Sequence, residues 1–162
     1  MPRIYIGIGS NVDRENSIRG AVRELAAHYA PLTLSPVYES KAHGFEGGNF
    51  YNLVAGFDTA EPIEHIKESL SSIESRFGRT RQGDRFSART LDLDLLLYDD
   101  IVRHDSQVNL PHPDIRRYAF VLRPLADIAP DLRNPETRLT YAEMWKQFDK
   151  DGQEIWPVKI EL

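Results

Sequence analysis

Residues 89–100 read RTLDLDLLLYDD, a strand-like run in which two carboxylates interrupt one of the most apolar segments of the chain. Side chains two residues apart in a β-strand share a face, so Asp92 and Asp94 point one way and the leucines around them point the other. We expect the leucine face to pack under helices, where each buried side chain contributes about 1.5–3 kcal/mol. The aspartate face is then expected to line an open cleft.

The remaining elements follow from hydrophobic periodicity on either side of this strand. The spacings predict strands over residues 3–9, 32–40, 50–59 and 89–99, and helices over 14–29, about 61–77 and 114–127. Asp13 is placed to cap the first helix, and Pro36 indicates an edge or a bulge in the second strand. The order is that of a βαββαβ unit. The expected fold is α+β: a ferredoxin-like sandwich with a four-stranded antiparallel sheet, helices on one face and C-terminal helical additions.

Length and composition predict one domain over residues 1–162. No apolar run approaches the ~20 residues of a membrane helix, and the N-terminus does not read as an export signal, so we expect a cytoplasmic protein with no membrane partner. The absence of cysteine excludes disulfides, thiolate zinc sites and cysteine nucleophiles. A formal charge of −5 argues against a nucleic-acid partner. We expect a monomer.

Arginines cluster just before the aspartate pair. Five lie within fourteen residues: Arg76, Arg79, Arg81, Arg85 and Arg89. Two carboxylates roughly 6–7 Å apart repel each other by ~2–3 kcal/mol at an effective dielectric near 20, and a cation would remove that penalty. Oxygen ligands favour Mg²⁺ over zinc, and guanidinium groups suit phosphates. The combination indicates phosphoryl-type transfer.

Other readings of these motifs are available. An Asp-x-Asp pair alone is also compatible with a solvated strand face. The chain has no GxxxxGK[ST] motif, and GIGSN at 7–11 is followed by Val12 where a GxGxxG motif needs its third glycine. The order of elements also differs from that of a dinucleotide-binding fold, so we reject a site of that kind.

The chain resembles the 6-hydroxymethyl-7,8-dihydropterin pyrophosphokinase family of folate biosynthesis. The motifs that carry the resemblance are RTLDLDLLLYDD, LPHPDIRRYAFVLRPLADIAPDL at 110–132, IGSN at 8–11, FYN at 50–52 and IESRFGRTR at 73–81. Together they cover nearly the whole chain, and the pairing of RTLDLD with PHP is highly specific. The resemblance implies transfer of the terminal pyrophosphate of ATP to the hydroxymethyl group of the dihydropterin, with release of AMP.

The resemblance also implies roles for individual residues. Asp92 and Asp94 match metal ligands for two Mg²⁺ ions that bridge the ATP phosphates. The implied catalytic residues are Arg79, Arg89, Asp92 and Asp94, and the implied ATP-binding positions are Glu74, Arg79, Arg81, Arg89, His112 and Tyr118. The implied pterin-binding positions are Ser40, Ala42, His43, Gly44, Phe50, Asn52, Asp92 and Phe120. Rings such as Phe50 and Phe120 can stack on a flat heterocycle, and the Asn52 amide can pair with its polar edge.

Several positions depart from the family pattern. Tyr118 stands where the family commonly has an arginine that touches phosphate. The other departures are Gln82, Phe86, Ser87-Ala88 and His43. They leave open a second hypothesis, a divergent paralogue that binds nucleotide or pterin with weak or altered transfer. A third hypothesis, RNA binding by a ferredoxin-like sheet, is disfavoured by the net acidity and by the aspartates on the expected open face.

Overall fold

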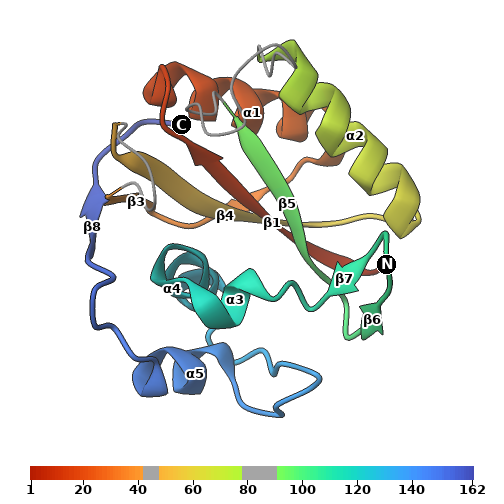
Figure 1. The fold of residues 1–162 in the computed structure, drawn as a ribbon. Helices are drawn as coiled ribbons and strands as arrows, with labels where there is room; N and C mark the ends of the chain where they lie inside the picture. The colour runs from red at the N-terminus through yellow and green to blue at the C-terminus, as the bar shows by residue number, and fades with distance from the viewer. Residues whose placement is uncertain (42–47, 78–90) are drawn as a thin grey trace.

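The computed structural model describes residues 1–41, 48–77 and 91–162 (Figure 1). Within this part of the chain the main sheet has six strands in antiparallel pairings: β1 Arg3–Ser10, β2 Thr33–Leu34, β3 Val37–Ser40, β4 Phe50–Asp58, β5 Asp92–Tyr98 and β8 Ile155–Val158. Their order is β5-β1-β4-β3-β8, with β2 also pairing with β4. The α+β class is confirmed. The expected four strands are too few, because β8 adds an outer strand and the predicted strand 32–40 is divided in two.

Helices lie on both faces of the sheet, which corrects the expectation of helices on one face (Figure 1). Helices α1 Arg14–Tyr29 and α2 Ile63–Arg76 cover one face and enclose the first core cluster. On the other face, α3 Asp114–Arg117, α4 Ala119–Ile128 and α5 Tyr141–Gln147 contribute to a second cluster. A separate hairpin pairs β6 Arg103–His104 with β7 Asn109–Leu110. No helix of the described residues is both long and apolar enough to span a membrane.

Strand β5 alternates as its sequence predicts. Leu93 and Leu95 are buried in the first core cluster, while Asp92 and Asp94 are half-buried on the opposite face. The register between β1 and β5 then shifts between Tyr5 and Ile6. This bulge adds a residue to β5, so that two successive leucines, 96 and 97, both belong to the second cluster.

Three local predictions differ in detail. Asp13 lies at the N-terminus of α1 with φ of 46°, but its side chain accepts a hydrogen bond from Asn16 (3.1 Å) and does not cap the helix. The predicted strand 32–40 is interrupted at Ser35, whose hydroxyl accepts the backbone N–H of Val54 at 2.9 Å. The predicted helix 114–127 is two helices, because Tyr118 is extended, with φ −125° and ψ 128°.

Candidate functional site

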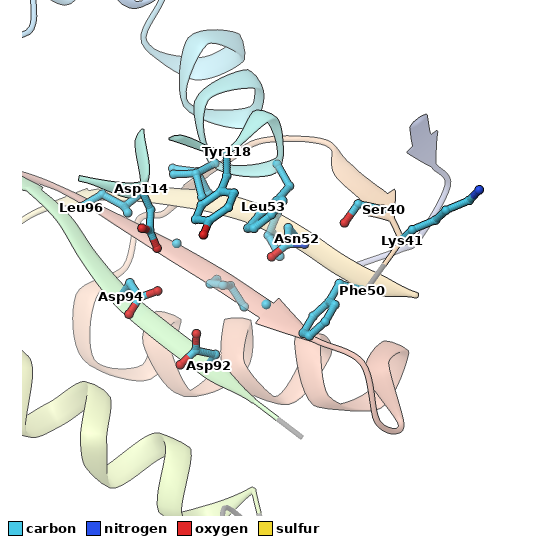
Figure 2. Close-up of a pocket in the computed structure, with 16 residues that line it drawn as sticks. Ser40, Lys41, Phe50, Asn52, Leu53, Asp92, Asp94, Leu96, Asp114 and Tyr118 are labelled. Carbon is cyan, nitrogen blue, oxygen red and sulfur yellow. The ribbon is translucent and has the colours of Figure 1, made fainter. Parts of the chain in front are cut away.

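The centre of the site is a strip of backbone without side chains on β1. Gly7 lies opposite Val54 on β4 and Asp94 on β5, and Gly9 lies opposite Asn52 and Asp92. Because neither glycine has a side chain, the sheet between β4 and β5 is hollowed at this point. The aspartates from β5 and the amide from β4 border the hollow from two sides (Figure 2).

A cavity of about 270 Å³ lies over these glycines, and we call it the first cavity. Residues from the sheet and from the α3–α4 segment line it: Gly7, Ile8, Gly9, Ser40, Lys41, Phe50, Asn52, Leu53, Val54, Asp92, Asp94, Leu96, Asp114, Tyr118, Phe120 and Val121. The wall is mostly apolar, with polar groups at the aspartate side and at Asn52 (Figure 2). Cavities of this composition suit a flat organic ligand with a polar edge.

Aromatic rings form part of the wall of the first cavity. The rings of Tyr118 and Phe120 are stacked, with centroids 4.9 Å apart and planes 16° apart. Phe50 contributes a ring from the start of β4 (Figure 2). Both rings lie at the start of α4, which the extended backbone of Tyr118 separates from α3.

Asn52 presents a buried amide in the first cavity. Its residue is 9% exposed, and its Nδ2 has no hydrogen-bond partner among the described residues. A buried donor left unpaired costs about 1–3 kcal/mol, so the presence of the Asn52 amide at this place needs an explanation. A ligand acceptor at this place in the cavity would supply the missing hydrogen bond.

A second cavity of about 410 Å³ lies between α2 and the β6–β7 hairpin. Polar residues are frequent in its wall, which comprises Lys67, Leu70, Ser71, Glu74, Leu93, Asp94, Leu95, Asp105, Ser106, Gln107, Val108, Asn109, Leu110 and His112. Glu74 is 7% exposed, and its carboxylate accepts the backbone N–H of Leu93 at 2.8 Å. This bond joins α2 to the aspartate strand at the wall of the second cavity.

Asp94 lines both cavities, so the two share a wall at this carboxylate. Ligand atoms of Asp94, His112 and Asp114 lie within 4.8 Å of one another, and all three residues are half-buried. His112 Nδ1 accepts the backbone N–H of Asp114 at 3.1 Å. Burial lowers the pKa of His112, against the opposing effect of the carboxylates of Asp114 and Asp92. Asp92 and Asp94 lie on one face of β5, and the Asp114 carboxylate lies close to Asp94. Carboxylate oxygens grouped in this way suit a hard divalent cation.

The structure brings together most of the predicted site residues that it describes. Ser40, Phe50, Asn52, Asp92, Asp94 and Phe120 line the first cavity, and Glu74, Asp94 and His112 line the second. Tyr118 was expected among the ATP-binding positions but lines the first cavity. The remaining predicted residues lie outside the described residues: Ala42, His43, Gly44, Arg79, Arg81 and Arg89.

Sequence reasoning missed some residues of the site. Asp114 was overlooked although it directly follows the PHP motif, which is a signal that could have found it. Lys67, Gln107 and Asn109 in the second cavity had no comparable signal, because they come from a surface face of α2 and from the short β6–β7 hairpin.

The chain is similar to known proteins over most of its length. A family model described as 7,8-dihydro-6-hydroxymethylpterin-pyrophosphokinase (HPPK) matches residues 5–130. A 2-amino-4-hydroxy-6-hydroxymethyldihydropteridine pyrophosphokinase of Aquifex aeolicus is 35% identical over 154 residues, which are 94% of this chain and 93% of that protein. The protein of the same description from Bacillus subtilis is 35% identical over 159 residues, covering 96% and 90% of the two chains.

A solved structure supports the fold at much lower identity. Wild-type HPPK-DHPS of Plasmodium falciparum has a TM-score of 0.70 and 12% identity to this chain. The match covers 90% of this chain and 44% of the Plasmodium chain, so this chain spans less than half of that longer protein.

Proposed function

The chain belongs to the 7,8-dihydro-6-hydroxymethylpterin-pyrophosphokinase family, and we propose that its two cavities are the two substrate sites of the family's reaction. It transfers pyrophosphate from ATP to hydroxymethyldihydropterin in folate biosynthesis. In this reaction the pterin hydroxyl oxygen bonds to the β-phosphorus of ATP. The bond from that phosphorus to the α,β-bridging oxygen breaks, AMP leaves, and the hydroxyl proton passes to solvent or a base. The protein's task is then to align an alcohol with a triphosphate.

We assign the pterin to the first cavity. Its aromatic wall offers stacking to a flat ring, and the unpaired Nδ2 of Asn52 can donate to a ring acceptor. Ser40 lies at the same end of the cavity as Phe50 (Figure 2). In this assignment Ala42, His43 and Gly44, which follow β3, complete the pterin site.

We assign ATP to the second cavity. Its wall contributes the cation of Lys67 and the polar side chains of Gln107, Asn109 and His112. It also contains three carboxylates, those of Glu74, Asp94 and Asp105. A triphosphate needs cations to approach these acids. The proposal therefore includes Arg79, Arg81 and Arg89 as phosphate ligands, with Arg79 and Arg89 assisting transfer.

Two Mg²⁺ ions held by Asp92 and Asp94 would supply the rest of the positive charge. The residues fit this role because both carboxylates lie on one face of β5 and Asp94 reaches the wall common to both cavities. When bound, Mg²⁺ neutralises phosphate charge during transfer. Phe50, Tyr118 and Phe120 exclude water on the pterin side, and the Glu74 bond to Leu93 holds β5 in place.

The single observation that carries this assignment is that Asp94 lines both cavities. We expect Asp94→Asn to lower AMP formation by at least about 100-fold, since it removes a charge needed where the transferred group must lie. Its affinity for the dihydropterin should change little. Asp100→Asn, in the exposed turn after β5, is the matched control and should keep full activity. Normal AMP release by Asp94→Asn, measured by chromatography, would contradict the assignment.

The alternative functions gain less support. A binding-only paralogue is not favoured, because the described family positions are assembled around both cavities. RNA binding needs an open sheet face, and α4 packs on the face that carries the aspartates. The single domain, the monomeric state and the cytoplasmic location stay predictions.

A further inference from the structure

We propose that Tyr118 determines pterin affinity as part of an aromatic wall with Phe120, and that it is not a nucleotide ligand. This inference rests on the proposed function, since it assumes that the first cavity holds the pterin. It replaces the ATP-binding role that the resemblance implies for Tyr118.

The backbone fixes Tyr118 at the junction of two helices. Its N–H donates to the Asp114 carbonyl at 3.0 Å, and its own carbonyl accepts the N–H groups of Val121 (3.1 Å) and Leu122 (3.0 Å). The residue thus ends α3 and begins α4 in an extended conformation. Its side chain lines the first cavity and does not line the second.

The ring of Tyr118 is held by stacking. It lies on Phe120 with a centroid distance of 4.9 Å and nearly parallel planes, so it covers one face of that ring. Its hydroxyl projects into the cavity (Figure 2). A planar ligand in the first cavity therefore meets a wall of two stacked rings.

The ring at position 118 is neutral, and this limits what it can contribute to the first cavity. The cavity is lined by three carboxylates, those of Asp92, Asp94 and Asp114, and by the cation of Lys41. Tyr118 adds area for stacking and no charge. Its contribution should therefore be seen in the affinity for the uncharged heterocycle and not in the affinity for the triphosphate.

The test uses the full chain with Tyr118→Leu and Tyr118→Phe. Calorimetry would give the Kd of α,β-methylene ATP with Mg²⁺, and then the Kd of hydroxymethyldihydropterin in the presence of that analogue, which cannot be cleaved at the α,β position. We expect Tyr118→Leu to raise the pterin Kd about tenfold, or about 1.4 kcal/mol. Tyr118→Phe keeps the stack and should stay within about twofold of wild type. The nucleotide Kd should stay within about twofold in both.

Phe148→Leu is the control for loss of an aromatic stack. Phe148 stacks on Trp145 with centroids 5.7 Å apart, and neither residue lines the first or the second cavity. Neither Kd should change in this variant, and thermal melting would verify that every variant is folded. The inference would be overturned if Tyr118→Leu left the pterin Kd unchanged or weakened only nucleotide binding. It would also be overturned if Tyr118→Phe lost as much pterin affinity as Tyr118→Leu. Wild-type protein that binds both ligands but forms no AMP would instead reject the proposed function.

Discussion

A side chain at Gly9 would displace the amide of Asn52. A Cβ built on it would lie 2.6 Å from the Oδ1 of Asn52, well inside van der Waals contact. Gly7, two residues earlier on the same strand face, differs: its Cβ would meet Leu96 at an ordinary 3.5 Å. The two glycines therefore make a matched pair for testing what the floor of the first cavity does.

We expect Gly9→Ala to raise the pterin Kd at least about tenfold, because the added methyl must displace the Asn52 amide. Overpacking of this kind typically also costs about 1–3 kcal/mol of stability. Gly7→Ala should change the pterin Kd by less than about threefold. Calorimetry and urea unfolding of both variants provide the measurement. Equal effects of the two substitutions would show that the amide position is not what Gly9 protects.

Some site residues could be predicted from the sequence alone and others could not. Asp92 and Asp94 were predictable because polar residues in a period-two apolar strand must face away from the core. Asn52 was implied by the resemblance, and an amide in an apolar strand needs partners in any case. The location of Tyr118 was not predictable, because it depends on a break between α3 and α4. The helical spacing of apolar residues continues across this break and gives no sign of it.

In the small β6–β7 hairpin, the side chain of Asp105 accepts three hydrogen bonds. Asp105 Oδ1 accepts the backbone N–H groups of Gln107 and Val108, both at 2.9 Å, and its Oδ2 accepts from Arg103 at 2.7 Å. The bond from Arg103, followed by those from the two backbone groups, lowers the pKa of Asp105 from 3.8 to about 2. These bonds shape the turn that borders the second cavity.

We expect Asp105→Ala to raise the Kd of α,β-methylene ATP about fivefold, with the pterin Kd unchanged. The loss of fixed backbone at Gln107 and Asn109 should outweigh the removal of one of the three carboxylates in the second cavity. Asp149→Ala is the control: Asp149 accepts a similar backbone bond, from Asp151 at 3.1 Å, and lines neither cavity. A loss of nucleotide affinity of the same size in both variants would contradict the role of the hairpin.

The same substitution has a defined pH dependence. Because the folded-state pKa of Asp105 is depressed, its contribution to stability is complete above about pH 4 and disappears as the pH falls through about 2. The unfolding free energies of wild type and Asp105→Ala should therefore converge on acidification. Urea titrations at several pH values would measure this.

Long elements were predictable and short ones were not. Helix α1 has the predicted bounds, and the other long elements, β1, β4, α2 and β5, lie within a few residues of theirs, because their apolar spacing extends over several turns or pleats. Strands β6 and β7 have two residues each and show no period at all. The helical spacing of apolar residues in 114–127 was recognised, but this spacing does not show which face of the sheet the helix will cover.

At the scale of the whole molecule, the C-terminal segment returns to the sheet and completes it. Strand β8 pairs with β3, and Trp156 Nε1 donates to Glu39 at 3.0 Å. Glu39 also accepts from Arg14 (2.9 Å) and Asn49 (3.2 Å). Burial opposes its ionisation, but the hydrogen bonds from Trp156, Arg14 and Asn49 lower its pKa. Four separate segments thus meet at one carboxylate.

We expect Trp156→Phe to lower the free energy of unfolding by about 1.5 kcal/mol, since it removes a hydrogen bond to a charged acceptor. Trp145→Phe is the matched control, because a phenyl ring can keep the stack on Phe148 and can still lie beneath the cations of Arg123 (5.3 Å) and Lys150 (4.5 Å). Urea denaturation monitored by circular dichroism would compare the two. A larger loss in Trp145→Phe would place the stabilising contact elsewhere.

The pairing of β8 with β3 also means that the outer edge of β3 lacks its partner strand during most of synthesis. Residues 37–40 emerge early, but the strand that covers their outer edge, 155–158, is made more than a hundred residues later. Until then the outer edge of this strand has no partner and is open to mispairing with other chains.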